Sequence, residues 1–123
     1  MKILLAIGLG SFIGGICRYL LSQIIHIKTE SLFPMSTFIV NIIGSFAIGL
    51  VFALAAKGDI SKEFQLFLAT GVLGGFTTYS AFSNETFILM RDGHLVFALI
   101  YILTSITIGL LATFLGYSIL KLF

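Results

Sequence analysis

Residues 71–82 read Gly71-Val-Leu-Gly74-Gly75-Phe-Thr77-Thr78-Tyr79-Ser80-Ala-Phe82 and interrupt an apolar segment long enough to cross a bilayer. A plain membrane anchor has no use for three glycines, two threonines and a serine near its middle. Backbone that leaves the helix at membrane depth is tolerated only where protein buries it or water lines it. We therefore predict a transmembrane helix that breaks in this stretch, where Gly74-Gly75 permits unusual backbone torsions, and whose freed backbone groups bind a ligand.

The rest of the chain is equally apolar and predicts one transmembrane domain over residues 1–123. Hydrophobic residues make up 59% of the sequence and charged residues only 10%, far from the composition of a soluble domain. A spanning helix needs about 20 mostly apolar residues, and four segments qualify. The fold class is therefore all-α, an integral membrane protein with helices over residues 3–25, 34–56, 64–90 (broken near 74–80) and 95–120.

Local signals support these helix ends. Pro34 suits the first turn of the second helix, where its missing N–H costs nothing. Gly58 suits a helix C-cap, and Ser61 suits the N-cap of the third helix. The segment that begins at Met1-Lys2 continues past the length of a signal-peptide core, so we interpret it as the first transmembrane helix.

Composition excludes several classes of function. The net charge of +2, without a basic run, argues against nucleic-acid binding. Cys17 is the only cysteine, which excludes an intrachain disulfide and a cysteine-based metal site. His26 and His94 lie near predicted loops and are interpreted as interfacial side chains. No carboxylate pair or nucleophile–base set indicates an enzyme.

The positive charges give only a weak orientation signal. Four helices place both termini and the second connector on one side of the membrane. That side carries four lysines, against two or three basic residues on the other: Lys2, Lys57, Lys62 and Lys121 against Lys28, Arg91 and, if it reaches outward, Arg18. The charge bias permits either cytoplasmic termini or insertion in both orientations. Dual insertion would allow an antiparallel homodimer.

Three polar residues inside the spans are functional candidates, because burying them in lipid is costly. Arg18, late in the first helix, either reaches the interface or attracts anions. Asn41, between Val40 and Ile42, makes either an interhelical hydrogen bond or a contact with a ligand. Glu85 follows the break, where a carboxylate either stabilises a helix N-terminus or takes part in permeation.

The last helix carries a polar track, a series of residues four positions apart that share one helix face. Its members are Tyr101, Ser105, Gly109 and Thr113. Tyr79 and Phe82 also share a face if a new helix starts near Ser80, and their electropositive ring edges suit an anion. The aromatic pair by itself favours ordinary packing over a ligand contact, because the chain contains 13 Phe.

Small residues recur four apart in three helices: Gly10 with Gly14, Ser45 with Gly49, and Gly71 with Gly75. Such spacing lets helices approach closely in lipid, and we interpret most of these pairs as packing positions.

Taken together, these motifs resemble the Fluc (CrcB) family of bacterial fluoride channels. The resemblance covers the whole chain and rests on one motif in each of the first three helices: Gly14-Gly-Ile-Cys-Arg18-Tyr19, Asn41-Ile-Ile-Gly44-Ser-Phe, and residues 71–82 followed by Ser83-Asn84-Glu85. It implies passive, selective fluoride export across the bacterial inner membrane by a dual-topology antiparallel homodimer with two pores.

The resemblance also implies roles for particular residues. The backbone carbonyls of Gly74 and Thr77, from both subunits, would hold a structural sodium ion (Na+) at the dimer centre. The fluoride pathway would comprise Asn41, Tyr79, Phe82, Tyr101, Ser105 and Thr113, with Arg18 at the vestibule and Glu85 beside the pore. This chain departs from the family pattern at two positions: Tyr79 replaces the usual phenylalanine, and Gly109 leaves a gap in the polar track.

Two other membrane proteins compete with this interpretation. A small multidrug-type transporter has the same length and helix count, but that family implies an acidic residue in the first helix, and none is present here. A non-transporting assembly subunit would explain the apolar composition, but not the combination of Asn41, a broken helix and a polar track.

Overall fold

The computed structural model describes residues 1–123 as helices joined by short connections, without a strand. Three continuous helices are long and apolar enough to cross a membrane: α1 (Lys2–Lys28), α2 (Met35–Lys57) and α6 (Leu95–Lys121). The remaining segment is divided into α3 (Lys62–Leu66), the π-helix η1 (Phe67–Leu73), α4 (Gly74–Phe76) and α5 (Tyr79–Arg91). The chain is therefore a multi-pass membrane protein with four helical segments.

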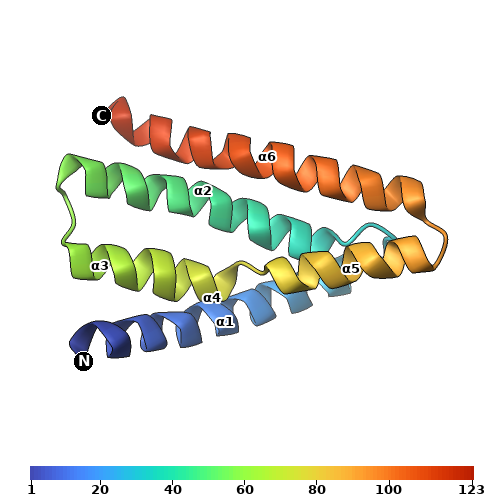
Figure 1. Ribbon diagram of the computed structural model, residues 1–123, viewed down its shortest axis with the longest axis horizontal. Helices are drawn as coiled ribbons and strands as arrows, with labels where there is room; N and C mark the ends of the chain where they lie inside the picture. Colours follow the sequence, from blue (N-terminus) through green and yellow to red (C-terminus); the bar gives the residue numbers. More distant parts are fainter.

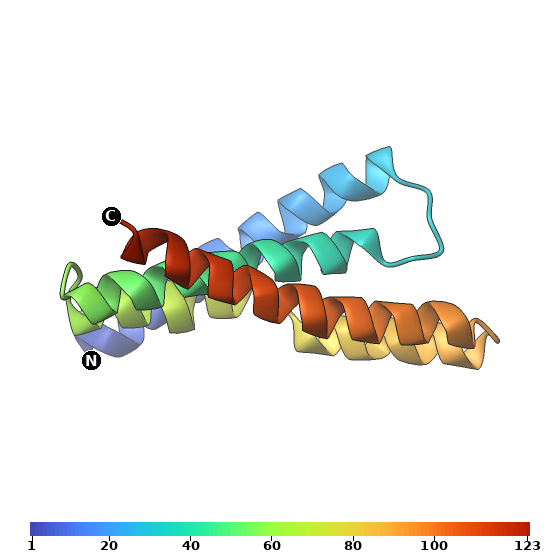
Figure 2. The ribbon, with the colours of Figure 1, turned by 90° about the horizontal axis from the view of Figure 1, so that it is seen from above.

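Both termini and the connection between α2 and α3 lie at one end of the molecule, as the sequence predicts (Figure 1). The connections between α1 and α2 and between α5 and α6 lie at the other end. The second half of α1 diverges from α2, α5 and α6, as the perpendicular view shows (Figure 2). The C-terminal end of α1 is therefore separated from the rest of the helix bundle on that side.

The predicted helix caps are present, with small shifts in the helix bounds. Gly58 follows α2 in the left-handed conformation, with φ of 79°, and Ser61 Oγ accepts a hydrogen bond from the Phe64 N–H at 3.2 Å. Helix α1 continues to Lys28, three residues beyond the prediction. Pro34 lies at the N-cap of α2 rather than inside its first turn.

Glycines bring α1 against η1 and α4. A Cβ on Gly14 would collide with the carbonyl oxygen of Val72, and one on Gly75 would collide with that of Ser11. A Cβ on Gly10 would lie 3.0 Å from the Cα of Gly71. The two glycine pairs thus face each other across one interface, which confirms that they are packing positions.

The prediction that Gly74-Gly75 itself opens the helix is wrong. Both residues belong to α4, Gly74 has helical torsions (φ −63°, ψ −36°), and neither has a positive φ. The two residues between α4 and α5 are extended instead: Thr77 with ψ of 155° and Thr78 with φ of −147° and ψ of 112°. The absence of a side chain at Gly75 allows α1 to pack closely on it. The helix is interrupted instead at Thr77 and Thr78, two β-branched residues that favour extended backbone.

Helices α2 and α6 pack side by side and run in the same direction (Figure 1). A Cβ on Gly49 would collide with the carbonyl oxygen of Thr113, and a Cβ on Gly109 would lie 3.6 Å from Ser45 Oγ. Both pairs are 64 residues apart. This register brings the polar track of α6 against one face of α2.

Candidate functional site

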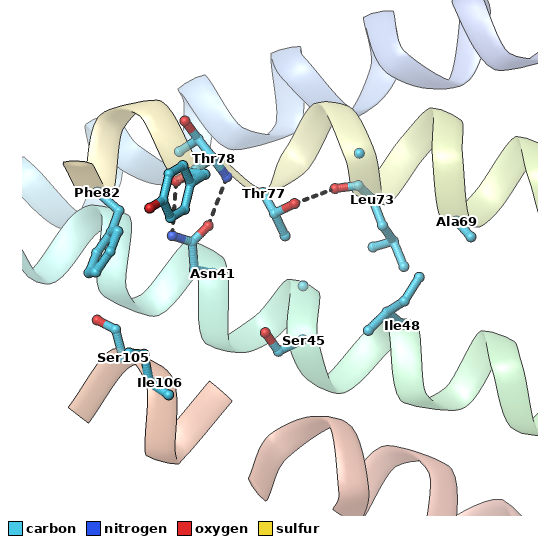
Figure 3. Close-up of a pocket in the computed structure, with 13 residues that line it drawn as sticks. Asn41, Ser45, Ile48, Ala69, Leu73, Thr77, Thr78, Phe82, Ser105 and Ile106 are labelled. Atoms are coloured by element: carbon cyan, nitrogen blue, oxygen red, sulfur yellow. Dashed lines mark hydrogen bonds between the residues drawn. The ribbon is translucent and has the colours of Figure 1, made fainter. Parts of the chain in front are cut away.

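An open pocket of about 410 Å³ lies beside the extended residues between α4 and α5. It is bounded by residues of α2, η1, α4, α5 and α6 (Figure 3). Most of the residues singled out from the sequence meet here: Asn41, Gly74, Thr77, Tyr79, Phe82 and Ser105 line the pocket together. Three separate stretches of the chain, within residues 41–48, 69–82 and 105–106, therefore contribute to one site.

Asn41 joins α2 to the extended connection. Its Oδ1 accepts a hydrogen bond from the Thr78 N–H at 2.8 Å, and its Nδ2 donates to the Thr78 carbonyl at 3.1 Å (Figure 3). The hydrogen bond to another segment that was one of the two alternatives for Asn41 is thus present. A side-chain amide has two N–H groups, so one remains for a ligand.

The backbone carbonyls of Gly74 and Thr77 have lost their helical partners. In a continuous helix they would accept from the N–H groups of Thr78 and Ala81. The Thr78 N–H donates to Asn41 instead, and the Ala81 N–H donates to Thr78 Oγ1 at 3.2 Å. Gly74 is also exposed. These two carbonyls are consequently available to an external donor or a cation.

Aromatic rings form one side of the site. The centroids of Tyr79 and Phe82 are 5.8 Å apart, and those of Phe82 and Tyr101 are 5.0 Å apart, with ring planes inclined by 46° and 58°. Tyr79 is 80% exposed, whereas Tyr101 is fully buried. The rings thus lead from the open side of the pocket into the interior.

Ser105 places an unpaired hydroxyl in this environment. Its Oγ is buried and makes no hydrogen bond with another protein group. A buried hydroxyl without a partner costs about 1–3 kcal/mol. Ser105 lines the pocket, so the partner that its O–H lacks within the protein can be a ligand or a water there.

Glu85 lies beyond the rings and is held by two hydroxyls. Its Oε1 accepts from Thr37 Oγ1 at 2.6 Å, and its Oε2 accepts from the buried Tyr101 hydroxyl at 2.7 Å. Of the two alternatives given for Glu85, stabilisation of a helix N-terminus is wrong, because α5 begins at Tyr79 and has no acidic residue in its first turn. The carboxylate instead ties α5 to α2 and α6.

Glu85 also borders a second pocket of about 280 Å³, at the end of the molecule where α1 and α5 finish. Asp92, His26 and His94 line this pocket, and both histidines are exposed, as an interfacial position predicts. A hydrogen bond from the Arg91 guanidinium, together with its charge, lowers the pKa of Asp92. Glu85 thus lies between the mouth of this pocket and the aromatic rings.

Three predicted residues lie outside both pockets: the buried Tyr101 described above, Arg18 and Thr113. Arg18 is half-buried on α1 and makes no hydrogen bond or ion pair with another residue. Thr113 Oγ1 donates to the Ser45 carbonyl at 2.9 Å and lies 3.2 Å from the Gly109 carbonyl. Thr113 therefore holds α6 to α2, one helical turn beyond the gap at Gly109.

Sequence reasoning missed three residues of this site: Thr37, Ser45 and Thr78. A signal for two of them was present, because Thr37, Asn41 and Ser45 are four residues apart and share one face of α2. This face forms a second polar track that matches the track of α6 position by position. Thr78 had no comparable signal, since its role depends on where the helix ends.

Comparison with known proteins agrees with this architecture. The sequence model of the family described as CrcB-like protein, Camphor Resistance (CrcB), matches residues 5–117. A protein of Thermus thermophilus named fluoride-specific ion channel FluC is 44% identical over 117 residues, which cover 95% of this chain and 94% of that protein. A protein of the same name from Shewanella pealeana is 40% identical over 116 residues, 94% of each chain. With so much of its length matched, the chain belongs to the CrcB family.

Proposed function

We propose that this protein is a fluoride-selective passive channel that lets fluoride leave the cytoplasm across the bacterial inner membrane. The single observation that carries the proposal is the buried, unpartnered hydroxyl of Ser105 in a pocket at membrane depth. A small anion that accepts hydrogen bonds satisfies such a donor. The relatives' names, fluoride-specific ion channel FluC, identify the anion.

Several modest contacts would replace the hydration shell of fluoride. Ser105 offers its O–H, Asn41 its remaining N–H, and Tyr79 and Phe82 their ring edges. None of these groups carries a full positive charge. Binding can therefore be strong enough for entry and weak enough for release, as conduction requires.

The pathway continues from Phe82 past Tyr101 to Glu85 and the second pocket. The hydroxyls of Tyr101 and Thr37 both donate to Glu85 along this part and hold its carboxylate in place, and Thr113 supports the opposite end of the α6 track. Arg18 has no partner within the protomer, so its charge can raise the local concentration of anions at the vestibule.

We infer further that the working unit is an antiparallel homodimer with one pore for each protomer. Free carbonyls at Gly74 and Thr77 and an exposed Tyr79 are costly if they face lipid. A second copy with the opposite orientation would cover them. The weak charge bias between the two ends permits insertion in both orientations.

The same carbonyls suit a structural sodium ion. Backbone carbonyl oxygens are the ligands that hard monovalent cations take in broken membrane helices. Gly74 and Thr77 of two protomers would supply four such oxygens without changing any side chain. When bound, the ion would neutralise the carbonyl dipoles and contribute positive potential near the anion pathways.

Fluoride efflux from liposomes that contain the purified protein tests the proposed function. We expect rapid release of fluoride, measured with a fluoride electrode, and negligible release of chloride under the same gradient. A folded dimer that releases no fluoride contradicts the proposal. The multidrug-type alternative predicts proton-coupled uptake of a cationic drug, although α1 contains no Asp or Glu to carry the proton.

A further inference from the structure

The polar track of α6 lacks a side chain at Gly109, and a residue of another helix lies at that level. We propose that Ser45 of α2 supplies the hydroxyl that Gly109 does not, and that it contacts fluoride between Ser105 and the far end of the track. This assignment rests on the proposed function. It adds a specificity-determining residue that the α6 pattern alone does not reveal.

The register of α2 and α6 places Ser45 there. Thr37 and Tyr101 bond the two oxygens of one carboxylate, and Asn41 and Ser105 line one pocket. The next pair in this series, again 64 residues apart, is Ser45 with Gly109. Ser45 Oγ is the nearest atom, at 3.6 Å, to the position that a Cβ on Gly109 would occupy.

The hydroxyl of Ser45 is free to bind a ligand. Serines in membrane helices commonly donate to a carbonyl of the preceding turn. Ser45 Oγ makes no such bond and has no other hydrogen-bond partner in the protein. Ser45 lines the pocket one turn along α2 from Asn41, so its hydroxyl faces the same space as Ser105 (Figure 3).

Thr113 holds Ser45 in place. A threonine hydroxyl has a single hydrogen, and Thr113 Oγ1 lies 2.9 Å from the Ser45 carbonyl. This bond fixes the backbone of Ser45 against α6. Thr113 therefore acts as a positioning residue for the Ser45 hydroxyl.

A rescue experiment tests the assignment. The variants are Ser45→Ala, Ser45→Ala/Gly109→Ser and the matched control Ser45→Ala/Gly109→Ala. A side chain at Gly109 fits, because its Cβ would make only ordinary contacts, at 3.6 Å from Ser45 Oγ and 3.9 Å from Ile42 Cδ1. Each protein is purified as the dimer, checked by thermal unfolding, and assayed for fluoride efflux from liposomes.

We expect Ser45→Ala to slow fluoride efflux about tenfold, the effect of losing one hydrogen bond to a charged group. Gly109→Ser should restore efflux to within about threefold of the parent protein, and Gly109→Ala should not. Unchanged efflux in Ser45→Ala, or equal rescue by both substitutions at Gly109, overturns the assignment while leaving the channel function intact. A parent protein that releases no fluoride overturns both.

Discussion

Asn41 and Thr78 form a closed pair in which the side-chain amide of one residue bonds both backbone groups of the other, at 2.8 and 3.1 Å. This geometry resembles the pairing between two backbone amides. It satisfies Thr78 where the helix is interrupted, and it leaves the Gly74 carbonyl without its usual partner. One side chain of α2 therefore both stabilises the interruption and exposes the carbonyl beside it.

Asn41→Asp should separate the structural role of Asn41 from its role in the anion pathway. An aspartate can still accept from the Thr78 N–H, but its second oxygen faces the Thr78 carbonyl and its charge repels an anion. We expect the dimer to remain assembled by size-exclusion chromatography and fluoride efflux to fall at least about tenfold. Efflux equal to that of the parent protein would remove Asn41 from the pathway.

Asn41→Ala should act mainly on stability, because it leaves the N–H and the C=O of Thr78 both unpaired. Each unpaired group costs about 1–3 kcal/mol. The loss should appear as a lower midpoint of unfolding in detergent titration. Ser105→Ala is the matched control, since the hydroxyl that it removes has no partner in the protein. Equal stability of the two variants would contradict a stabilising role for the hydrogen-bonded pair of Asn41 and Thr78.

Gly14→Ala should weaken the contact between α1 and η1. The added Cβ would collide with the Val72 carbonyl, which is backbone and cannot rotate away. Overpacking of this kind costs about 1–3 kcal/mol. Gly15→Ala, on the adjacent residue with nothing within 4 Å of its Cβ position, should be neutral. The measurement is the midpoint of unfolding in detergent. An equal effect of both substitutions would mean that helix propensity, and not packing against Val72, determines the change in stability.

Helix number, helix caps and glycine packing could be predicted from the sequence because each depends on local chemistry. Hydrophobic length locates a span, Gly58 ends α2 through its left-handed torsions, and Ser61 caps α3 through one hydrogen bond. The interruption of the third crossing segment was harder. The flexible Gly74-Gly75 pair is helical, and α1 packs closely on Gly75, so the glycine there serves a tertiary contact rather than a change of backbone direction.

The partners of the polar residues could not be predicted either. A threonine or serine in a membrane helix usually bonds its own backbone, as Thr104 does with the Ile100 carbonyl. Thr37 and Ser45 look the same in sequence, yet one bonds Glu85 and the other has a free hydroxyl. The difference arises from the register of α2 against α6, which only the folded chain defines.

Glu85 and Tyr101 should be energetically coupled. In Glu85→Gln the amide nitrogen cannot accept, so either Thr37 or Tyr101 loses its acceptor. A double-mutant cycle with Tyr101→Phe should give a coupling of about 1–3 kcal/mol in unfolding titrations. The same cycle with Thr113→Val, whose hydroxyl bonds elsewhere, should be additive. Additivity in both cycles would show that Glu85 does not depend on the Tyr101 hydroxyl.

Replacing sodium by caesium should destabilise the dimer, because carbonyl oxygens spaced for a small cation fit a larger one poorly. Ligand binding to the folded state raises stability with the logarithm of ligand concentration, so the unfolding temperature should increase with sodium and not with caesium.

Thr77→Val should keep this sodium dependence, since the Thr77 hydroxyl already donates to the Leu73 carbonyl at 2.9 Å and only the Thr77 carbonyl is available to the ion. A sodium dependence that disappears in Thr77→Val would transfer the ligand role to the hydroxyl. Identical stability and efflux in the two salts would exclude a structural sodium ion altogether.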